Sequence, residues 1–487
     1  MPYNVPQNID PDKIFLVNFS ELEGRWDPTF TIYNKNINHY AFPIVRLQDL
    51  IAKNPQYGTA ESGIPRISEL APRYIRITDI DELGNLDDGL GATAENIEMQ
   101  YILNENDILF ARSGATVGKA YLHRKQPYVC FFAGYMIRFV VDNTKILPQY
   151  LFIYTQLKPY KDWVKAIQRA AAQPNINAEE YKSLPTSLPP LHIQQQIVDV
   201  YNVALSLRKK KLSVSKAKLA SIDKYLLDEL GITLPQKDNS LEKRIFTVNF
   251  SKVSGRRLDP KCYSTESQLI NDAISKGTYE CRMLKGFLVH SIAGDWGYDE
   301  NEEKTNSEKC LVIRSTEFDN EYNLKLDNSR AKYRNILKNK LDNINLQVGD
   351  LLIEKSGGSE EQPVGRVAII TDEILSFGNI CYSNFIHKIS VTDILPEYLY
   401  CYLKTAHNIK LTDSMQSQTN GLRNLILKEY FNQLIPLPPL EKQREIANNI
   451  AAIRAEAKRL EQEGEEILQS ARLQVEQIIL GEKDIEG

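Results

Sequence analysis

The chain has 487 residues, a formal net charge of −4, 42% apolar residues and 25% charged residues. This length is too great for one ordinary hydrophobic core and predicts two to four domains. No run approaches the roughly 18 apolar residues of a membrane span, and the polar first residues are not expected to form a signal peptide. Six scattered cysteines without a Cys-x-x-Cys pair argue against a zinc site or a disulfide framework and favour a cytoplasmic protein.

The main feature of the sequence is an internal repeat with a period of about half the chain. Residues 14–25 and 245–256 are identical at eight of twelve positions, and further matches follow in the same order with a steadily growing offset. These matches pair 106–114 with 349–357, 117–119 with 364–366, 146–154 with 394–402, and 188–191 with 437–440. A repeat this long indicates two copies of one domain and not a solenoid, whose units run about 20–50 residues.

Each copy begins with a β-rich module. Runs such as 73–78, 107–110 and 135–141 alternate apolar and polar residues and predict strands, with Gly-Asn and Asp-Gly turns between runs. Residues 148–158 and 396–404 predict short helices with a Tyr/Leu face. We therefore expect twisted, mainly β modules that also contain helices.

A long helix is predicted after each module. The chain has no proline for about 40 residues after each Pro-Pro pair, and proline is tolerated at a helix start but not inside a helix. In the second copy, apolar and small residues recur at spacings of four and three over 446–471, which is typical of a coiled-coil seam. In the first copy the seam covers 193–207 and then shifts register to 219–230, with Gly231 as a plausible stop.

The expected fold class is α+β, with two similar modules separated by two long antiparallel coiled-coil helices in a pseudo-twofold arrangement. Each helix would be roughly 60 Å long, and a single exposed helix of that length is marginal unless its seam is buried. The predicted boundaries are 1–187 for the first module, 188–232 for the first helix, 233–244 for a linker, 245–436 for the second module and 437–487 for the second helix.

Two sequence patterns resemble parts of catalytic sites, but neither matches the motif that the chemistry requires. The segment 114–120 is one residue short of a phosphate-binding loop and lacks the Ser or Thr after its lysine. The nuclease-like carboxylates Asp350 and Glu354 are not kept as a pair, because the first copy has Ala111 where Glu354 stands. The chain is expected to lack an active site and a metal site of its own.

The order module, helix, module, helix, with Leu-Pro-Pro-Leu-x-x-Gln-x-x-Ile opening each helix, resembles the specificity subunits of type I restriction–modification systems. The resemblance covers nearly the whole chain, and the segment 107–119 resembles a loop motif of that family's target-recognition domains. It implies that each module reads one half of a split target in double-stranded DNA and that the helices set the spacing. It also implies two methyltransferase subunits as partners, restriction/translocase subunits where these are present, and S-adenosylmethionine as a cofactor of the methyltransferase and not of this chain.

Residues that are polar or basic in both copies are the candidate DNA contacts, since Arg favours guanine edges and Lys favours phosphate. Their alternative role is a solvated surface or a local salt bridge. They are Arg76, Arg112, Ser113, Thr116, Lys119, Arg124, Gln173, Asn175, Arg314, Lys355, Ser356, Arg366, Gln418 and Asn420.

The basic stretch 208–211, with Lys216 and Lys218, has three alternatives to a plain solvated face. It could face the DNA spacer, an acidic partner, or the acidic segment 461–466 of the other helix. Two other functions also compete with a specificity subunit. A freestanding DNA-binding protein would bind its site without partners and with a steep salt dependence. A helical scaffold with no role in DNA binding would assign no function to the two modules.

Overall fold

The computed structural model describes residues 16–18, 28–36, 40–168, 174–236, 245, 247–253, 263, 265–302, 304–319, 323–326, 330–359, 362–419 and 422–483. Most of the repeated segment 14–25, part of its counterpart 245–256 and part of the predicted linker 233–244 lie outside these residues. The chain divides into two compact units, the first made of Met1–Leu212 with Glu461–Gly487 and the second of Ser213–Leu460. No helix in the described ranges is long and apolar enough to span a bilayer.

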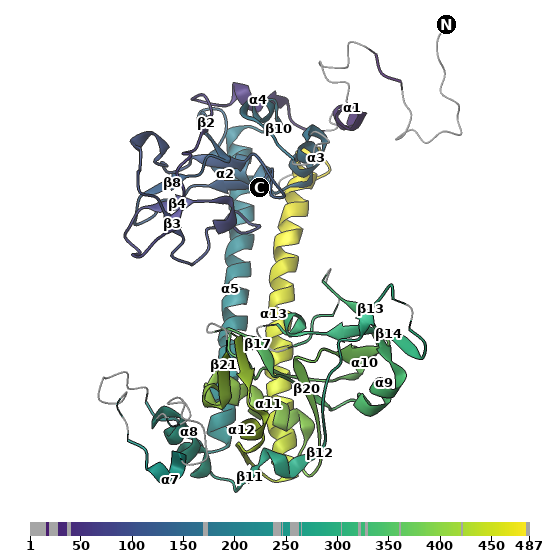
Figure 1. Ribbon diagram of the computed structural model, residues 1–487. Coiled ribbons are helices and arrows are strands. Elements are labelled where there is room, and N and C mark those ends of the chain that lie inside the picture. The colour runs from purple at the N-terminus through teal and green to yellow at the C-terminus, as the bar shows by residue number, and fades with distance from the viewer. Residues whose placement is uncertain are drawn as a thin grey trace. The chain divides into compact units, whose positions relative to one another are not determined.

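The first unit contains three sheets (Figure 1). One is the antiparallel pair β1–β10, one has the order β2-β9-β6-β7, and one has the order β3-β5-β4-β8 with β4 and β8 parallel. The strands are β1 (Ile44–Arg46), β2 (Gln56–Tyr57), β3 (Ile64–Pro65), β4 (Arg73–Ile75), β5 (Ala92–Thr93), β6 (Ile108–Ala111), β7 (Ala120–Leu122), β8 (Cys130–Phe132), β9 (Met136–Phe139) and β10 (Pro185–Ser187).

Helices of the first unit cover the β2-β9-β6-β7 sheet and join it to the long helices in one hydrophobic core. This core includes Trp163 of α3 and Ile197 of α5, and both side chains are fully buried. The helices are α1 (Pro28–Asn36), α2 (Pro148–Tyr154), α3 (Lys158–Ile167), α4 (Ala178–Lys182), the first part of α5 (Leu191–Glu229) and the last part of α13 (Leu440–Leu480).

The second unit repeats these three sheets and adds a fourth. The sheets have the orders β11-β23, β12-β20-β16-β18 and β13-β15-β14-β19, and the added sheet has the order β17-β22-β21. The strands are β11 (Cys281–Met283), β12 (Leu288–Ala293), β13 (Tyr298–Asp299), β14 (Ser307–Ile313), β15 (Tyr333–Leu337), β16 (Leu351–Glu354), β17 (Ser356–Gly358), β18 (Val367–Ile369), β19 (Ile380–Tyr382), β20 (Ile386–Val391), β21 (Gln416–Thr419), β22 (Leu422–Leu425) and β23 (Leu434–Pro436). The helices are α7 (Phe250–Val253), α8 (Thr265–Ser275), α9 (Lys338–Ile344), α10 (Asp372–Leu375), α11 (Pro396–Asn408) and α12 (Leu427–Phe431), with the remaining parts of α5 and α13.

The glutamine of each Leu-Pro-Pro-Leu-x-x-Gln motif fastens the long helix to its module. The Gln194 side chain accepts a hydrogen bond from the Leu147 N–H at 2.8 Å and donates to the Pro189 carbonyl at 2.8 Å. Gln443 makes the same two bonds in the second unit, to the Leu395 N–H and the Pro438 carbonyl, both at 2.8 Å. Both glutamines are buried, so the motif that carried the family resemblance is a structural joint.

The two long helices run antiparallel in each unit. In the first unit Arg208 contacts Glu465 and Arg472 contacts Tyr201, and in the second unit Lys442 contacts Glu229. Gly464 lies opposite Arg208, and an added Cβ would make ordinary van der Waals contact with Arg208 Cγ at 3.4 Å. The family resemblance and the seam together thus led to the correct fold class, and α5 ends at Glu229, next to the predicted stop.

Two local predictions were wrong. Leu207 was assigned to the seam, but its side chain is 46% exposed. The predicted helix 148–158 is shorter than expected, because α2 ends at Tyr154 and a second helix, α3, begins at Lys158 with Pro159 in its first turn, where the missing N–H is tolerated. The second copy has no proline at this place, and α11 continues without a break.

A buried histidine in the first unit predicts a pH-dependent stability. The His123 ring bonds the Tyr121 hydroxyl at 3.0 Å, and burial lowers the pKa of His123 to about 4. Below its ordinary pKa near 6.5 the unfolded chain binds the proton and the folded chain does not, so stability falls as the pH falls from about 6.5 to 4. We expect His123→Asn to reduce the loss of unfolding free energy between pH 7 and pH 5 by about 2 kcal/mol, measured by urea unfolding. An unchanged loss in the variant would contradict the assignment.

Candidate nucleic-acid interface

The loop after β6 presents one arginine of the first unit at the surface. The Arg112 N–H donates to the Tyr135 carbonyl at 3.0 Å, and the Arg112 carbonyl accepts from the Ile176 N–H at 2.8 Å. Its guanidinium lies 4.9 Å from the centre of the Tyr57 ring. The backbone of Ser113 pairs with that of Asn175, so the structure brings Arg112, Ser113 and Asn175 together.

Two glycines in this loop have different roles. Both have a positive φ, which favours glycine. An added Cβ at Gly114 would meet nothing within 4 Å, whereas one at Gly118 would lie 2.6 Å from Val164 Cγ1. Gly114 therefore leaves the loop surface open next to the exposed Thr116, and Gly118 allows the loop to pack on α3.

Lys119 points inward from the end of the loop. Its Nζ lies 2.8 Å from the Ile80 carbonyl oxygen and 3.0 Å from a carboxylate oxygen of Glu82. The side chain is half-buried, and these contacts hold the loop to the segment after β4. This geometry favours the salt-bridge alternative over a DNA contact.

The second unit builds the equivalent loop after β16. The Lys355 N–H donates to the Phe385 carbonyl at 2.9 Å, and the Lys355 carbonyl accepts from the Leu425 N–H at 2.7 Å. Ser356 pairs with Asn424 of β22. Lys355 and Ser356 thus occupy the positions of Arg112 and Ser113, and both side chains are half-buried.

The prediction that Arg366 contacts DNA was wrong. Its side chain is 5% exposed and binds both oxygens of Glu354, each at 2.8 Å. Its remaining donors reach the Ser315 and Phe318 carbonyls at 3.0 and 3.3 Å. Burial raises the pKa of the Glu354 carboxyl, and the Arg366 charge partly offsets this rise. The pair is a buried link between β16 and β18.

Asp350 also has a structural role. Its carboxylate accepts hydrogen bonds from Lys388 at 2.9 Å and from the Ser390 hydroxyl at 2.5 Å, and all three residues belong to or adjoin the central sheet of the second unit. In the described ranges no group of three or more His, Cys, Asp or Glu side chains could hold a metal ion.

Arg76 and Arg314 occupy the same turn in the two units. Arg76 binds Asp79 with two hydrogen bonds of 3.1 and 2.7 Å, and Arg314 binds Glu317 with two of 3.2 and 2.6 Å. Their side chains keep 35% and 23% of their exposure, so each is anchored and still reaches the surface. Arg124 is exposed after β7. Gln173, Asn420 and the Gln418 side chain lie outside the described part of the chain.

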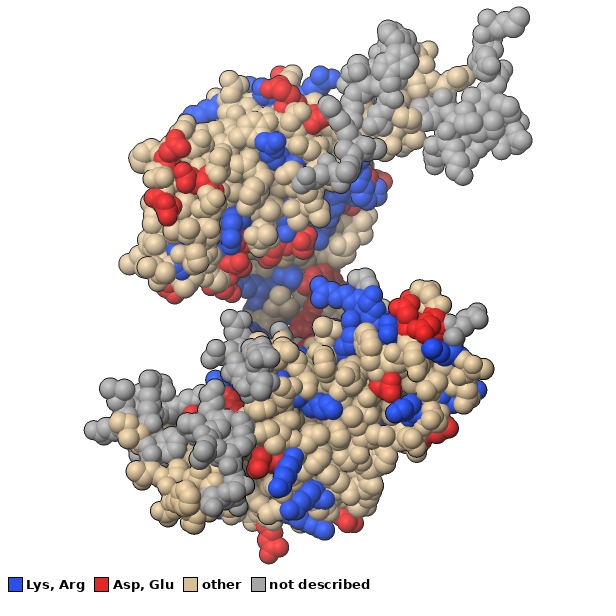
Figure 2. Space-filling view, viewed as in Figure 1, with Lys and Arg blue, Asp and Glu red and all other residues tan. Residues whose placement is uncertain are grey.

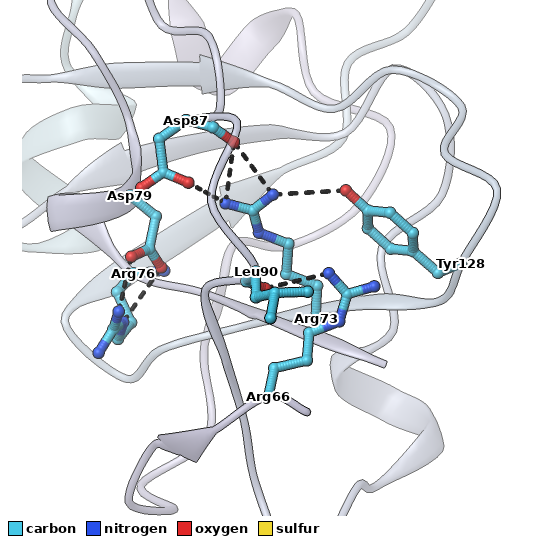
Figure 3. A network of polar contacts seen from close by, with 7 residues as sticks. All are labelled: Arg66, Arg73, Arg76, Asp79, Asp87, Leu90 and Tyr128. Atoms are coloured by element: carbon cyan, nitrogen blue, oxygen red, sulfur yellow. Dashed lines mark hydrogen bonds and ion pairs between the residues drawn. The ribbon is translucent and has the colours of Figure 1, made fainter. Parts of the chain in front are cut away.

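Two buried arginines that the sequence analysis did not single out brace the β3-β5-β4-β8 sheet (Figure 3). Arg73 of β4 bonds the Asp87 carbonyl at 3.2 Å and the Tyr128 hydroxyl at 3.4 Å, and it forms an ion pair with the Asp87 carboxylate. Arg66 donates to the Leu90 carbonyl at 3.1 Å. Because most of their hydrogen bonds go to backbone carbonyls of neighbouring loops, these arginines hold the loops against the sheet.

The basic stretch of α5 is partly neutralised within the first unit. Arg208 bonds Glu465 with its Nε at 3.0 Å, and Lys211 forms an ion pair with Glu463. These contacts confirm the predicted charge match between the helices for those two residues. Lys209 and Lys210 stay exposed. Elsewhere, Figure 2 shows basic and acidic side chains mixed on the visible face of each unit, which agrees with the small net charge.

The fold and these loops define a class of protein: a duplicated binding protein whose two modules each present a cation beside a Ser-Gly turn and each continue into a long helix. The model of the type I restriction modification DNA specificity domain matches residues 90–203 and 288–469, and the chain belongs to this family. It is thus a DNA-recognition subunit, which is the non-catalytic component of such a system. This membership does not support the freestanding DNA-binding protein or the scaffold without a DNA role.

Curated relatives agree with this assignment. The chain is 21% identical to the type I restriction enzyme EcoKI specificity subunit of Escherichia coli K12, over 75% of this chain and 71% of that protein. It is also 21% identical to the MjaVIII specificity subunit of Methanocaldococcus jannaschii, over 90% and 89% of the two chains. A solved structure of the HsdS subunit from Thermoanaerobacter tengcongensis aligns with a TM-score of 0.36 at 15% identity, covering 92% of this chain and 98% of that one.

Proposed function

We propose that each module reads one half of a bipartite DNA target for a type I restriction–modification complex. The observation that carries this proposal is the duplicated loop, in which Arg112 and Lys355 occupy the same hydrogen-bonded position. Two copies of one reading device on diverged modules suit a target whose halves differ in sequence. The long helices that continue from the modules would set the spacing of the halves.

The partners in this proposal are two methyltransferase subunits, with restriction/translocase subunits where these exist. The methyltransferase would bind S-adenosylmethionine and flip the adenine that it methylates. We place the complex in the cytoplasm, and the free thiols of the cysteines in the described ranges, Cys130, Cys281, Cys310, Cys381 and Cys401, support this compartment.

The function is tested by mapping methylated adenines across the host genome with and without this gene. We expect one bipartite motif to lose methylation when the gene is deleted and to regain it on complementation. A methylation pattern that does not depend on the gene would contradict the proposal.

A groove on the helix pair of the first unit supports the docking of a methyltransferase helix. It has a volume of about 830 Å³ and an apolar strip that includes Val200, Val203, Leu207 and Ile467, bordered by charged and polar side chains. Val203 is 59% exposed, which is unusual for a valine between two long helices. An amphipathic helix laid into this groove would bury these side chains.

We expect Leu207→Asp to weaken binding of the methyltransferase subunit about 100-fold, because a charge would then lie in an apolar contact. Binding is measured by titrating the purified subunit onto the full chain. Asn202→Asp is the matched control, since Asn202 is exposed on α5 but is not among the groove residues. Equal affinity of the Leu207→Asp variant and the wild type would exclude this groove as the docking site.

A further inference from the structure

An exposed aromatic ring stands at the same place in both units. Strands β8 and β19 each end in a tight turn in which the fourth residue donates its N–H to the carbonyl of the first. These bonds join Met136 to Ala133 and Ile386 to Ser383, both at 2.9 Å. The third residue of the turn is Tyr135 in the first unit and Phe385 in the second.

The two turns are equivalent in their surroundings as well. The N–H of the first turn residue bonds the last residue of the neighbouring parallel strand, with Ala133 bonding the Ile75 carbonyl at 3.1 Å and Ser383 bonding the Ile313 carbonyl at 2.8 Å. Duplication has therefore kept the backbone of the turn, and both copies carry an aromatic side chain at its tip.

These rings are exposed where their neighbours are not. Tyr135 is 39% exposed and Phe385 is 49% exposed, whereas Phe132 and Tyr382, three residues earlier, are fully buried. A single exposed aromatic residue is common on a protein surface. Two exposed aromatic residues at one aligned position are less easily explained by chance, because packing of the fold does not require an apolar side chain at an exposed turn position.

The rings also adjoin the cationic loops. The carbonyls of Tyr135 and Phe385 accept the N–H of Arg112 and Lys355, respectively, at 3.0 and 2.9 Å. An added Cβ at Gly357 would lie 3.8 Å from Cδ2 of Phe385, so this ring borders the Ser-Gly turn. In the first unit the positive charge of Arg76 acts on the Tyr135 hydroxyl and opposes the rise in its pKa that burial causes.

We propose that Tyr135 and Phe385 contact the DNA bases of the half-site that their own module reads, an inference that rests on the proposed function. Phenylalanine has no group that bonds a phosphate, so the feature that the two residues share is the apolar ring. A ring beside a cation suits a groove in which the cation binds a phosphate or a guanine while the ring packs on a thymine methyl group or a base. The position beside the loops, and not on the helix pair, favours DNA over a methyltransferase subunit as the partner.

The test uses the full chain in complex with its methyltransferase and a duplex carrying the motif mapped in the host. We expect Tyr135→Ala and Phe385→Ala each to weaken binding of this duplex about 10- to 100-fold, with an unchanged affinity for a scrambled duplex. We expect Tyr135→Phe to keep most of the affinity, since it keeps the ring. Met99→Ala and Val289→Ala are matched controls, because these apolar side chains are 82% and 63% exposed and belong to neither of the two loops. Melting temperatures near that of the wild type would verify the fold of each variant.

Three results would overturn the inference. Alanine variants that bind the target duplex like the wild type would show that the rings do not contact DNA. An equal loss on both duplexes would show that the rings support phosphate binding only. A loss of methyltransferase binding with intact DNA binding would assign the rings to the protein partner. If the wild-type complex itself does not prefer the target duplex, the proposed function fails together with the inference.

Discussion

Replacement of Arg366 by alanine should lower the unfolding free energy of the second unit by about 3–5 kcal/mol, because it leaves the Glu354 carboxylate buried without its partner. The effect is measured by urea unfolding of the full chain, followed by a probe in the second unit. The double variant Arg366→Met with Glu354→Leu should stay within about 2 kcal/mol of the wild type, since it removes both charges and keeps most of the volume.

The first unit supplies a matched comparison for this result. Lys119→Met changes the aligned cation, but the Glu82 carboxylate that it contacts is 92% exposed and can be solvated by water. We therefore expect a cost of no more than about 1 kcal/mol for this variant. If Arg366→Ala instead kept full stability and lost DNA affinity, the assignment of Arg366 to the interior would fail.

Replacement of Arg112 by alanine should weaken recognition of one half-site about 10- to 100-fold, which is the range for one lost contact to a base edge. Lys355→Ala should act on the other half-site. The effect is measured as the affinity for duplexes that carry a single base change in one half-site. A variant that no longer reads a half-site should bind with the same affinity whether or not that half-site carries the change.

Lys53→Ala serves as the control for the loss of a positive charge, because Lys53 is exposed and follows Ala52, which bonds Val140 at the opposite end of β9 from the Arg112 loop. A variant of Arg112 that weakened both half-sites equally would contradict independent reading by the two modules.

Much of the fold follows from the sequence because duplication allows one copy to be checked against the other. The aligned Pro-Pro pairs predicted where α5 and α13 begin, and the aligned ILP segments predicted the starts of α2 and α11 at Pro148 and Pro396. Hydrophobic spacing predicted most of the seam. It did not predict that Leu207, which lines the groove on the helix pair, stays 46% exposed, since the spacing shows on which face a residue lies but not how closely the other helix covers it.

The candidate site was harder to predict, because the identity of a basic residue does not show whether its side chain is exposed to solvent or buried in an ion pair. Arg366 is neutralised by Glu354, which pairs with it across adjacent strands. A signal existed: the second copy has Glu354 and Arg366, whereas the first copy has Ala111 and Lys119 at the aligned positions. The aromatic turn was missed because Tyr135 was included in a predicted strand and Phe385 was not compared with it.

The distribution of buried charges limits how these modules can be recombined. The backbone hydrogen bonds of Gln194 and Gln443 are the same, so a whole module could be exchanged between the Pro-Pro joints without disturbing either attachment. An exchange with a breakpoint between Asp350 and Lys388 of the second module would separate one or both of the pairs Glu354–Arg366 and Asp350–Lys388, and a carboxylate would then be buried without its partner. Hybrid genes that cross over at the joints should therefore yield folded proteins with new targets, whereas crossovers between residues 350 and 388 should yield insoluble ones.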